Sequence, residues 1–342
     1  MITRSPTVED RPAWRSALAR AWRDPVALLE SLELEPAAVG FDADAAARFP
    51  FRVTREWAAR IRPRDPHDPL LRQILPHLDE GRAMPGFDAD PVGERHLPPR
   101  GNLLQKYAGR ALLLLTGACA IHCRYCFRRE YPYAEHVGHS ALLDGLAIVA
   151  ADRDIDEVIL SGGDPLVLGD EALGDVLEQL ARIPHVRRIR LHTRLPVVLP
   201  ARVTARLLEL CASQPQAMVL VVHVNHAQEI DAATRAALAR CRAAGLTLLN
   251  QAVLLAGVND DVDNLAALSE TLFDAGVLPY YLHLLDRVAG SAHFEVSEPR
   301  AAALEAALRA RLSGYLVPRF VREVAGAASK LPFAAGRHDA VS

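Results

Sequence analysis

The sequence is poor in lysine. Of its 39 basic residues only two, Lys106 and Lys330, are lysines, and the other 37 are arginines. A codon bias toward arginine explains such a composition without any functional cause. The scarcity still has a consequence, because any chemistry that requires a side-chain primary amine has only these two candidates.

Other absences exclude whole classes of protein. Apolar runs such as residues 111–115 are as long as a strand and far shorter than the roughly 20 residues of a membrane-spanning helix. Residues 1–15 contain no apolar core of the kind found in a signal peptide. The net charge is −3, both signs are mixed along the chain, and no long basic run indicates a nucleic-acid partner. We therefore expect a soluble cytoplasmic protein that binds neither membrane nor nucleic acid.

Cysteine is also scarce, and its distribution is uneven. There are five cysteines, three of which are bunched at Cys119, Cys123 and Cys126. An odd number with this bunching does not suit a disulfide framework. In a reducing compartment it is more typical of metal binding or catalysis. Cys211 and Cys241 lie among leucine and alanine on expected helices, where small buried hydrophobic side chains are the simplest interpretation.

From about residue 110 onward, short apolar runs alternate with stretches of helical periodicity. This alternation predicts a parallel sheet, and the continuous apolar character of the strands indicates burial on both faces. Six or seven such units favour an α/β fold with a full or partial barrel. The expected strands are residues 111–116, 157–161, 188–193, 218–224, 247–255, 279–285 and 317–324, and the expected helices are residues 140–150, 170–183, 230–244, 262–275 and 299–311.

The first hundred residues have a different character. Residues 14–22 and 27–32 show helical apolar spacing, whereas residues 64–69 and 88–99 are punctuated by proline and are expected to form ordered loops or linkers. The sequence thus predicts three regions: a helical N-terminal extension (1–100), an α/β barrel (101–290) and a C-terminal segment (291–342). In such a barrel, chemistry collects at the carboxyl ends of the strands.

The bunched cysteines form a C-x₃-C-x₂-C motif in the loop after the first expected strand. Three thiolates can hold three irons of a [4Fe–4S] cluster, which leaves the fourth iron open to a small chelating molecule. Tyr125 supplies an aromatic neighbour that shields such a cluster. The alternative is a zinc site with His122 as fourth ligand, although zinc sites more often use paired C-x₂-C units.

A second motif, Ser161-Gly162-Gly163-Asp164, ends the next expected strand. Paired glycines allow a ligand to approach the backbone closely, so that amides there can meet the amine and carboxylate of a bound molecule. Without the cysteines, a tight turn between strand and helix would be the better explanation.

Taken together, these motifs resemble the lysine 2,3-aminomutase family of radical S-adenosylmethionine (SAM) enzymes. The resemblance spans residues from about 100 to 333 and includes both lysines with their flanks. It implies a partial (β/α)6-type radical SAM barrel with a helical N-terminal extension and a short C-terminal extension. The matching motifs are residues 106–110, 119–129, 161–164, 194–200, 223–226, 250–260, 279–281 with Asp286, and 329–332.

The resemblance implies three cofactors: a [4Fe–4S] cluster on the three bunched cysteines, S-adenosylmethionine, and pyridoxal 5′-phosphate. In such enzymes the cluster cleaves S-adenosylmethionine to a 5′-deoxyadenosyl radical. That radical takes hydrogen from the β-carbon of L-lysine, while pyridoxal phosphate holds the migrating amine. The activity implied is that of an isomerase that converts L-lysine into β-lysine.

The same resemblance assigns residues to each ligand. Lys330 matches the lysine that carries pyridoxal phosphate, and Arg128 matches the arginine that binds the substrate carboxylate. Asp286 and Glu323 match the carboxylates that bind the substrate ε-ammonium, with Glu323 standing where the family has an aspartate. Lys106, Tyr107 and Arg110 are expected beside pyridoxal phosphate, and Ser161, Gly162, Gly163, Asp164, His223, Asn225 and Gln251 are expected beside S-adenosylmethionine.

Residues 64–73 and the short C-terminus look most like the branch that serves elongation factor P. Those enzymes make (R)-β-lysine, which a lysyl ligase attaches to that factor. The family further implies a one-electron reductant of the flavodoxin or ferredoxin kind, and dimers or larger assemblies. Lysine-fermentation relatives continue past the pyridoxal lysine into a cysteine-bearing metal-binding tail, so no such tail site is carried over.

Two alternatives stay open. The first keeps the chemistry and changes the substrate to another α-amino acid, such as glutamate or arginine. Asp286 and Glu323 argue against glutamate, because their charges would repel its side chain. The second is a non-catalytic iron–sulfur or zinc protein, which the retention of Lys330, Arg128 and the glycine pair disfavours.

Overall fold

The computed structural model describes residues 12–97 and 100–333. Within these residues, nine strands form a single sheet in the order β1 to β9. Strands β2 to β8 are parallel neighbours, whereas β1 and β9 pair antiparallel at the two edges. The strands are β1 (Leu103–Tyr107), β2 (Arg110–Thr116), β3 (Glu157–Gly162), β4 (Arg188–Thr193), β5 (Ala217–Val222), β6 (Thr247–Val253), β7 (Leu278–His283), β8 (Arg319–Arg322) and β9 (Leu331–Pro332).

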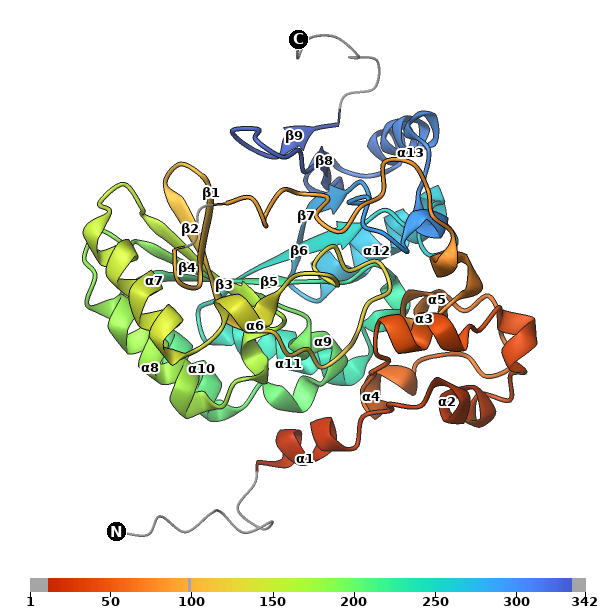
Figure 1. Cartoon of the computed structure of the whole chain (residues 1–342), viewed down its shortest axis with the longest axis horizontal. Helices are drawn as coiled ribbons and strands as arrows, with labels where there is room; N and C mark the ends of the chain where they lie inside the picture. Colours follow the sequence, from red (N-terminus) through yellow and green to blue (C-terminus); the bar gives the residue numbers. More distant parts are fainter. Residues whose placement is uncertain (1–11, 98–99, 334–342) are drawn as a thin grey trace.

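Helices connect the parallel strands in the alternation that the sequence predicts. Figure 1 shows α7, α8, α10 and α11 side by side along one side of the sheet. Counting from β2 to β7, each strand is followed by at least one helix, so the predicted partial (β/α)6 barrel is confirmed. The helices of this part are α6 (Tyr133–His136), α7 (His139–Ala151), α8 (Asp170–Ala181), α9 (Leu195–Val198), α10 (Ala205–Ala212), α11 (Ala232–Ala243), α12 (Val262–Asp274) and α13 (Glu298–Arg311).

Leucines in register form the core of the sheet. Leu113 pairs with Leu160, Leu160 with Leu191, Leu191 with Leu220, and Leu220 with Leu248. All five side chains are buried. A row of identical apolar side chains across five parallel strands fixes their relative register, because a shift by one residue would turn each leucine to the other face.

Short helices form the N-terminal extension. They are α1 (Ala13–Ala19), α2 (Pro25–Ser31), α3 (Ala43–Arg48), α4 (Arg55–Ala58) and α5 (Pro69–Ile74). Figure 1 shows α2 to α5 together beside the barrel and α1 apart from them. The start of α5 follows from its sequence: the Asp68 carboxylate accepts from the amides of Leu70 and Leu71, and Pro69 occupies the first helical position. Trp57 of α4 is completely buried and fixes the extension to the common core.

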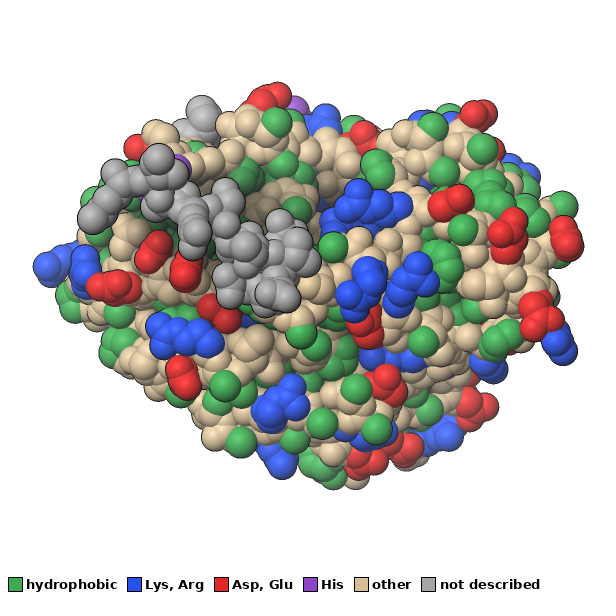
Figure 2. Space-filling view, turned by 90° about the horizontal axis from the view of Figure 1, so that it is seen from below, with side chains coloured by type: hydrophobic (Ala, Val, Ile, Leu, Met, Phe, Trp, Pro, Cys, Tyr) green, Lys and Arg blue, Asp and Glu red, His purple; other side chains and the backbone are tan. Residues whose placement is uncertain are grey.

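Two features of the surface follow from composition. Acidic and basic side chains are interspersed over the face shown in Figure 2. None of the described helices has both the length and the apolar character needed to cross a lipid bilayer. Residues 1–11, which make up most of the N-terminal stretch without an apolar signal-peptide core, lie outside the described residues. The same holds for residues 98–99 of the expected loop and 334–342 of the C-terminal segment.

Candidate active site

A cavity of about 810 Å³ opens on the inner side of the barrel. Loops that follow β2 and β3 line one part of it, and β1, β7, β8 and β9 contribute another part. The structure therefore brings together groups that are far apart in the sequence. Among the predicted site residues, the wall includes Lys106, Tyr107, Arg110, Cys119, Cys123, Cys126, Arg128, Ser161, Gly162, Gly163, Asp164, His223, Gln251, Asp286, Glu323 and Lys330.

The cysteine loop follows β2 and is tied to the N-terminal extension by its backbone. The amide of His122 donates to the Arg52 carbonyl at 2.9 Å, and the amide of Arg124 donates to the Gln73 carbonyl at 2.9 Å. The Arg124 side chain is fully buried, and its guanidinium donates to both carboxylate oxygens of Glu80. These contacts fix the loop on both sides of Cys123.

The three thiols are free and lie close enough to influence one another. Burial raises the pKa of Cys119 well above its ordinary value, and the neighbouring Cys126 sulfur raises it further. Burial and Cys123 likewise raise the pKa of Cys126 to about 11. Thiolates are the form that binds metal, so this site needs bound positive charge to hold three of them together. The donor set thus fits the three cysteine-bound irons of a cubane cluster.

A mononuclear zinc site fits the same residues poorly. The Nδ1 atom of His122 lies 2.7 Å from the Pro50 carbonyl oxygen, and its ring stacks on Phe49. The geometry therefore offers no support for His122 as a fourth ligand.

The glycine pair also packs against the start of the cysteine loop, a structural role that the sequence motif alone does not reveal. The amide of Gly163 donates to the Thr116 carbonyl at 2.6 Å, and the amide of Asp164 donates to the Ala118 carbonyl at 2.9 Å. A Cβ atom on Gly163 would lie 2.3 Å from the Ala118 oxygen. These two amides are thus used to hold the start of the cysteine loop, and the glycines are needed because that loop packs directly against them.

Arg128 lines the cavity, where its guanidinium pairs with Glu94, a residue that the sequence motifs do not single out. Its Nε and Nη2 atoms donate to the two carboxylate oxygens of Glu94 at 2.7 and 2.8 Å, and Nη1 donates to Ser161 at 3.3 Å. Burial would raise the pKa of Glu94, but the Arg128 guanidinium more than offsets it and holds the pKa below its ordinary value. Glu94 occupies one edge of the guanidinium and orients it, which leaves the Nη1–Nη2 edge for a second carboxylate.

Both lysines meet at one carboxylate. Glu323 accepts from Lys106 at 2.9 Å and from the Tyr107 hydroxyl at 2.6 Å, and its other oxygen contacts Lys330. Burial would raise the pKa of Glu323, but the two lysines lower it to about 2. Asp286 lines the same cavity, its carboxylate accepts no hydrogen bond from residues 12–97 and 100–333, and burial raises its pKa to about 7. The two predicted ammonium-binding carboxylates thus lie beside the predicted pyridoxal lysine.

Buried polar atoms without partners show where a ligand fits. The Nε atoms of Arg110 and Arg190 and the Nε2 atoms of His192 and His283 are buried and have no hydrogen-bond partner within residues 12–97 and 100–333. All four residues line the cavity. Unpaired buried donors are costly unless a bound group satisfies them, and two guanidinium donors suit a phosphate. This arrangement fits a phosphorylated cofactor near Lys330.

The residues predicted beside S-adenosylmethionine divide into two groups. His223 and Gln251 face the cavity, and burial lowers the pKa of His223 to about 4, so its ring is neutral. Asp164 also lines it, although its carboxylate accepts from Thr193 and from the Arg194 amide. Asn225 lies behind the wall, where its amide donates to Tyr125 and Gln73 at 2.6 and 3.0 Å and its oxygen accepts from the Val253 amide.

The sequence of this chain matches known proteins over almost its full length. Residues 113–268 match the model of the Radical SAM superfamily. The chain is 47% identical to L-lysine 2,3-aminomutase of Escherichia coli over 330 residues, which cover 96% of this chain and 95% of that protein. It is 41% identical to L-lysine 2,3-aminomutase of Haemophilus influenzae over 98% of this chain and 99% of that protein. The protein of the same name from Clostridium subterminale is 35% identical, over 82% of this chain and 68% of its own length.

Proposed function

The chain belongs to the lysine 2,3-aminomutase family of radical S-adenosylmethionine enzymes, and from this premise we propose that it converts L-lysine into (R)-β-lysine with the help of pyridoxal phosphate. Membership of the family makes it an isomerase that uses a [4Fe–4S] cluster and S-adenosylmethionine. The observation that carries the proposal is one cavity lined by three free cysteines together with the chain's only two lysines.

The proposed roles divide the cavity between its two ends. When bound, the cluster with S-adenosylmethionine supplies the radical that takes hydrogen from the substrate, and pyridoxal phosphate supplies the group that holds the amine. Cys119, Cys123 and Cys126 would hold the iron. Lys330 would bind pyridoxal phosphate through its amine, with Arg110 beside the phosphate.

The substrate is proposed from the charges that face it. The free edge of Arg128 would take the α-carboxylate, and Asp286 with Glu323 would take the ε-ammonium. This distribution suits a diamino acid, because glutamate would bring a second carboxylate toward two others. Closing these partners around the substrate keeps water away from the reactive carbon and holds the reacting groups in position.

We also propose how the regions divide the work. Residues 101–290 would provide the barrel, and the region 1–100 would cover the cluster end through its described part, residues 12–97. The region 291–342 would carry Lys330. The residues that would contact S-adenosylmethionine from the cavity wall are Ser161, Gly162, Gly163, Asp164, His223 and Gln251, whereas Asn225 would act from behind it. A one-electron donor of the flavodoxin or ferredoxin class would reduce the cluster.

The destination of the product is proposed from the branch that the chain resembles. Residues 64–73 look like those of enzymes that supply (R)-β-lysine for elongation factor P. A coupled assay tests this step: the purified protein, the lysyl ligase and elongation factor P are incubated with L-lysine, and the mass of the factor is measured. The mass should rise by that of one β-lysyl group, and an unchanged factor in the presence of free β-lysine product would contradict the link.

The central experiment is an anaerobic assay of the reconstituted protein with L-lysine, S-adenosylmethionine, pyridoxal phosphate and dithionite. Chiral chromatography should detect (R)-β-lysine, and Cys126→Ala protein should form none. If 5′-deoxyadenosine forms without β-lysine, the radical machinery stands and free lysine is the wrong substrate. If neither forms in protein that carries four irons, the proposed catalytic role is wrong.

A further inference from the structure

Arg194 lies at the end of β4 and contacts a cysteine of the cluster loop. Its Nη1 atom donates to the Cys123 sulfur at 2.8 Å, and its Nη2 atom donates to Glu229 at 2.8 Å and to Gln73 at 2.7 Å. The Arg194 side chain is only 7% exposed, and that of Glu229 is completely buried. None of the roles proposed above for the substrate or the cofactors uses this ion pair.

The N-terminal extension holds this arginine in place. Trp57 of α4 lies under the guanidinium, whose central carbon is 5.3 Å from the ring centroid. Gln73 of α5 accepts from Arg194, and its amide nitrogen donates to Glu229 at 3.1 Å. Stacking and hydrogen bonding together leave the guanidinium one orientation. The extension and the barrel thus meet at the sulfur of Cys123.

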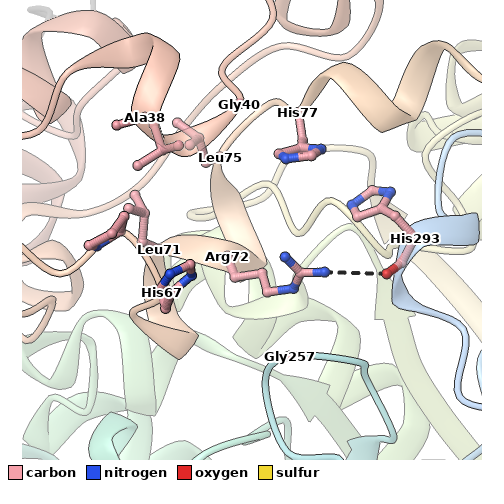
Figure 3. Close-up of a pocket in the computed structure, with 11 residues that line it drawn as sticks. Ala38, Gly40, His67, Leu71, Arg72, Leu75, His77, Gly257 and His293 are labelled. Carbon is pink, nitrogen blue, oxygen red and sulfur yellow. Dashed lines mark hydrogen bonds between the residues drawn. The ribbon is translucent and has the colours of Figure 1, made fainter.

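The helix that carries Gln73 is itself anchored to the barrel. Figure 3 shows Arg72 reaching from α5 toward His293 on the wall of a smaller cavity of about 260 Å³. Its Nε atom donates to the Ala256 carbonyl at 2.8 Å, and Nη2 donates to the His293 carbonyl at 3.4 Å. Adjacent residues of one short helix therefore bind two different parts of the barrel, so α5 has little freedom to move Gln73 away from Arg194.

We propose that Arg194 is a positioning residue for the iron–sulfur cluster, which the N-terminal extension holds against the Cys123 sulfur through Trp57 and Gln73. The inference rests on the proposed cluster ligands. Hydrogen bonds to cluster sulfurs and nearby charge set the reduction potential of such clusters. The positive guanidinium favours the reduced cluster, because reduction adds negative charge to the sulfurs. Glu229 weakens this effect because it compensates part of that charge.

The first test compares Arg194→Gln and Arg194→Lys with wild-type protein in an anaerobic redox titration followed by electron paramagnetic resonance. In Arg194→Gln the potential should shift to more negative values, and at a fixed solution potential the ratio of reduced to oxidised cluster should fall about tenfold, as for the loss of one charge-assisted hydrogen bond. Arg194→Lys keeps the charge, so its reduction potential should lie between those of wild-type and Arg194→Gln protein. An unchanged potential in Arg194→Gln protein with four irons would overturn the proposal.

The chain offers a matched control in Arg202. This arginine is also fully buried, stacks on Trp14 of the extension at 4.6 Å and pairs with Asp170 at 2.8 Å. It donates to the Leu166 and Leu168 carbonyls, and within residues 12–97 and 100–333 it forms no hydrogen bond to the cluster loop. Arg202→Gln should lower thermal stability and leave the potential unchanged. An equal shift in both variants would assign the effect to general loosening and would overturn the specific role of Arg194.

Glu229→Gln supplies a test with the opposite sign. Removal of the compensating carboxylate leaves the Arg194 charge stronger at the sulfur, so the potential should become less negative. A merely structural role of the ion pair predicts no such reversal. A more negative potential in Glu229→Gln, the direction expected for Arg194→Gln, would contradict the proposal.

A measurement on wild-type protein removes any dependence on the folding of variants. Protein labelled with ¹⁵N at the arginine guanidinium nitrogens should show a nitrogen hyperfine coupling in the pulsed resonance spectrum of the reduced cluster, and equally labelled Arg194→Gln protein should lose it. Gln73→Met, which removes the extension's acceptor, should weaken this coupling. Labelled wild-type protein with a reduced four-iron cluster and no coupling would overturn the inference about Arg194. Wild-type protein that binds no four-iron cluster would instead contradict the proposed function itself.

Discussion

The two ends of the cavity are held together by different forces. At the cluster end, the side chains of Arg194 and Glu229 are 7% and 0% exposed. They bind each other, Gln73 of α5 and the Cys123 sulfur, so that four segments of the chain meet there. At the lysine end, Lys330 and Lys106 are 25% and 17% exposed and share one carboxylate. The first arrangement is a buried hydrogen-bond network, and the second is a group of charges beside an open space.

This difference indicates different tasks. A buried network with many partners resists rearrangement, because each broken bond leaves a buried polar group unsatisfied. The charges around Glu323 can exchange partners at lower cost, because the cavity admits other charged groups. We therefore expect the cluster end to act as a fixed support and the lysine end to change its partners when ligands bind.

The substitution with the largest expected effect changes the lysine end and leaves the cluster end intact. Lys330→Ala should lose the pyridoxal absorbance and reduce β-lysine formation to background, because no amine at that position remains to bind the cofactor. Iron content and the resonance signal of the reduced cluster should be retained. Lys106→Arg, which alters the only other lysine, should keep the absorbance. Pyridoxal absorbance that persists in Lys330→Ala would show that the cofactor is bound elsewhere.

The next effect concerns the arginine between the two ends. Arg128→Lys should lower kcat/KM for L-lysine roughly 100-fold, about 3 kcal/mol, because an ammonium cannot bind Glu94 and a substrate carboxylate through two flat edges. Steady-state kinetics measure the change, and the cluster signal serves as the control for folding. Glu94→Gln should also raise KM for L-lysine, but by a smaller factor than Arg128→Lys does. A normal KM in Arg128→Lys would remove this residue from the substrate site.

The contrast between the ends also explains what the sequence could predict. Strands β2 to β8 were predictable, because each is a local apolar run and parallel neighbours repeat the pattern. The edge strands β1 and β9 were missed, since short antiparallel edges carry no such signature. The cysteine motif is equally local, with all three thiols within eight residues of sequence.

The partners of those motifs could not be predicted from local patterns. Glu94 meets Arg128 across 34 residues of sequence, and Gln73 meets Glu229 across 156. A single acidic or amide residue in a loop or short helix has no periodicity that marks it as buried, and its role depends on which segments the fold brings together. Glu323 and Lys330 were accessible only because their flanking residues resemble those of a known family.

A third prediction tests whether charge alone governs the lysine end. Glu323→Gln should lower kcat/KM roughly 30-fold, about 2 kcal/mol, because two ammonium groups then lose their common counter-ion and the substrate ε-ammonium loses a partner. Glu323→Asp keeps the charge and should retain most activity. Kinetics of the two variants at one pH provide the comparison. Equal losses in both would mean that side-chain length, and not charge, is decisive.

The smallest expected effect is a pH dependence confined to the lysine end. Because burial raises the pKa of Asp286 to about 7, the folded protein binds a proton there that the unfolded chain has already lost above its ordinary pKa of 3.8. Its contribution to stability is therefore largest below about pH 4 and is lost as the pH rises through about 7. In protein prepared without pyridoxal phosphate, the Tm of Asp286→Asn relative to wild type should rise between pH 5 and 7 and level off above.

The cluster end should show no such pH dependence. Arg194 holds the pKa of Glu229 below its ordinary value despite burial, so this carboxylate is ionised in the folded and the unfolded protein from pH 6 to 8. The Tm of Glu229→Gln should accordingly differ from that of wild type by a constant amount over this range. Thermal melts in matched buffers measure both differences, and a parallel pH response of the two variants would show that the ends of the cavity are not electrostatically distinct.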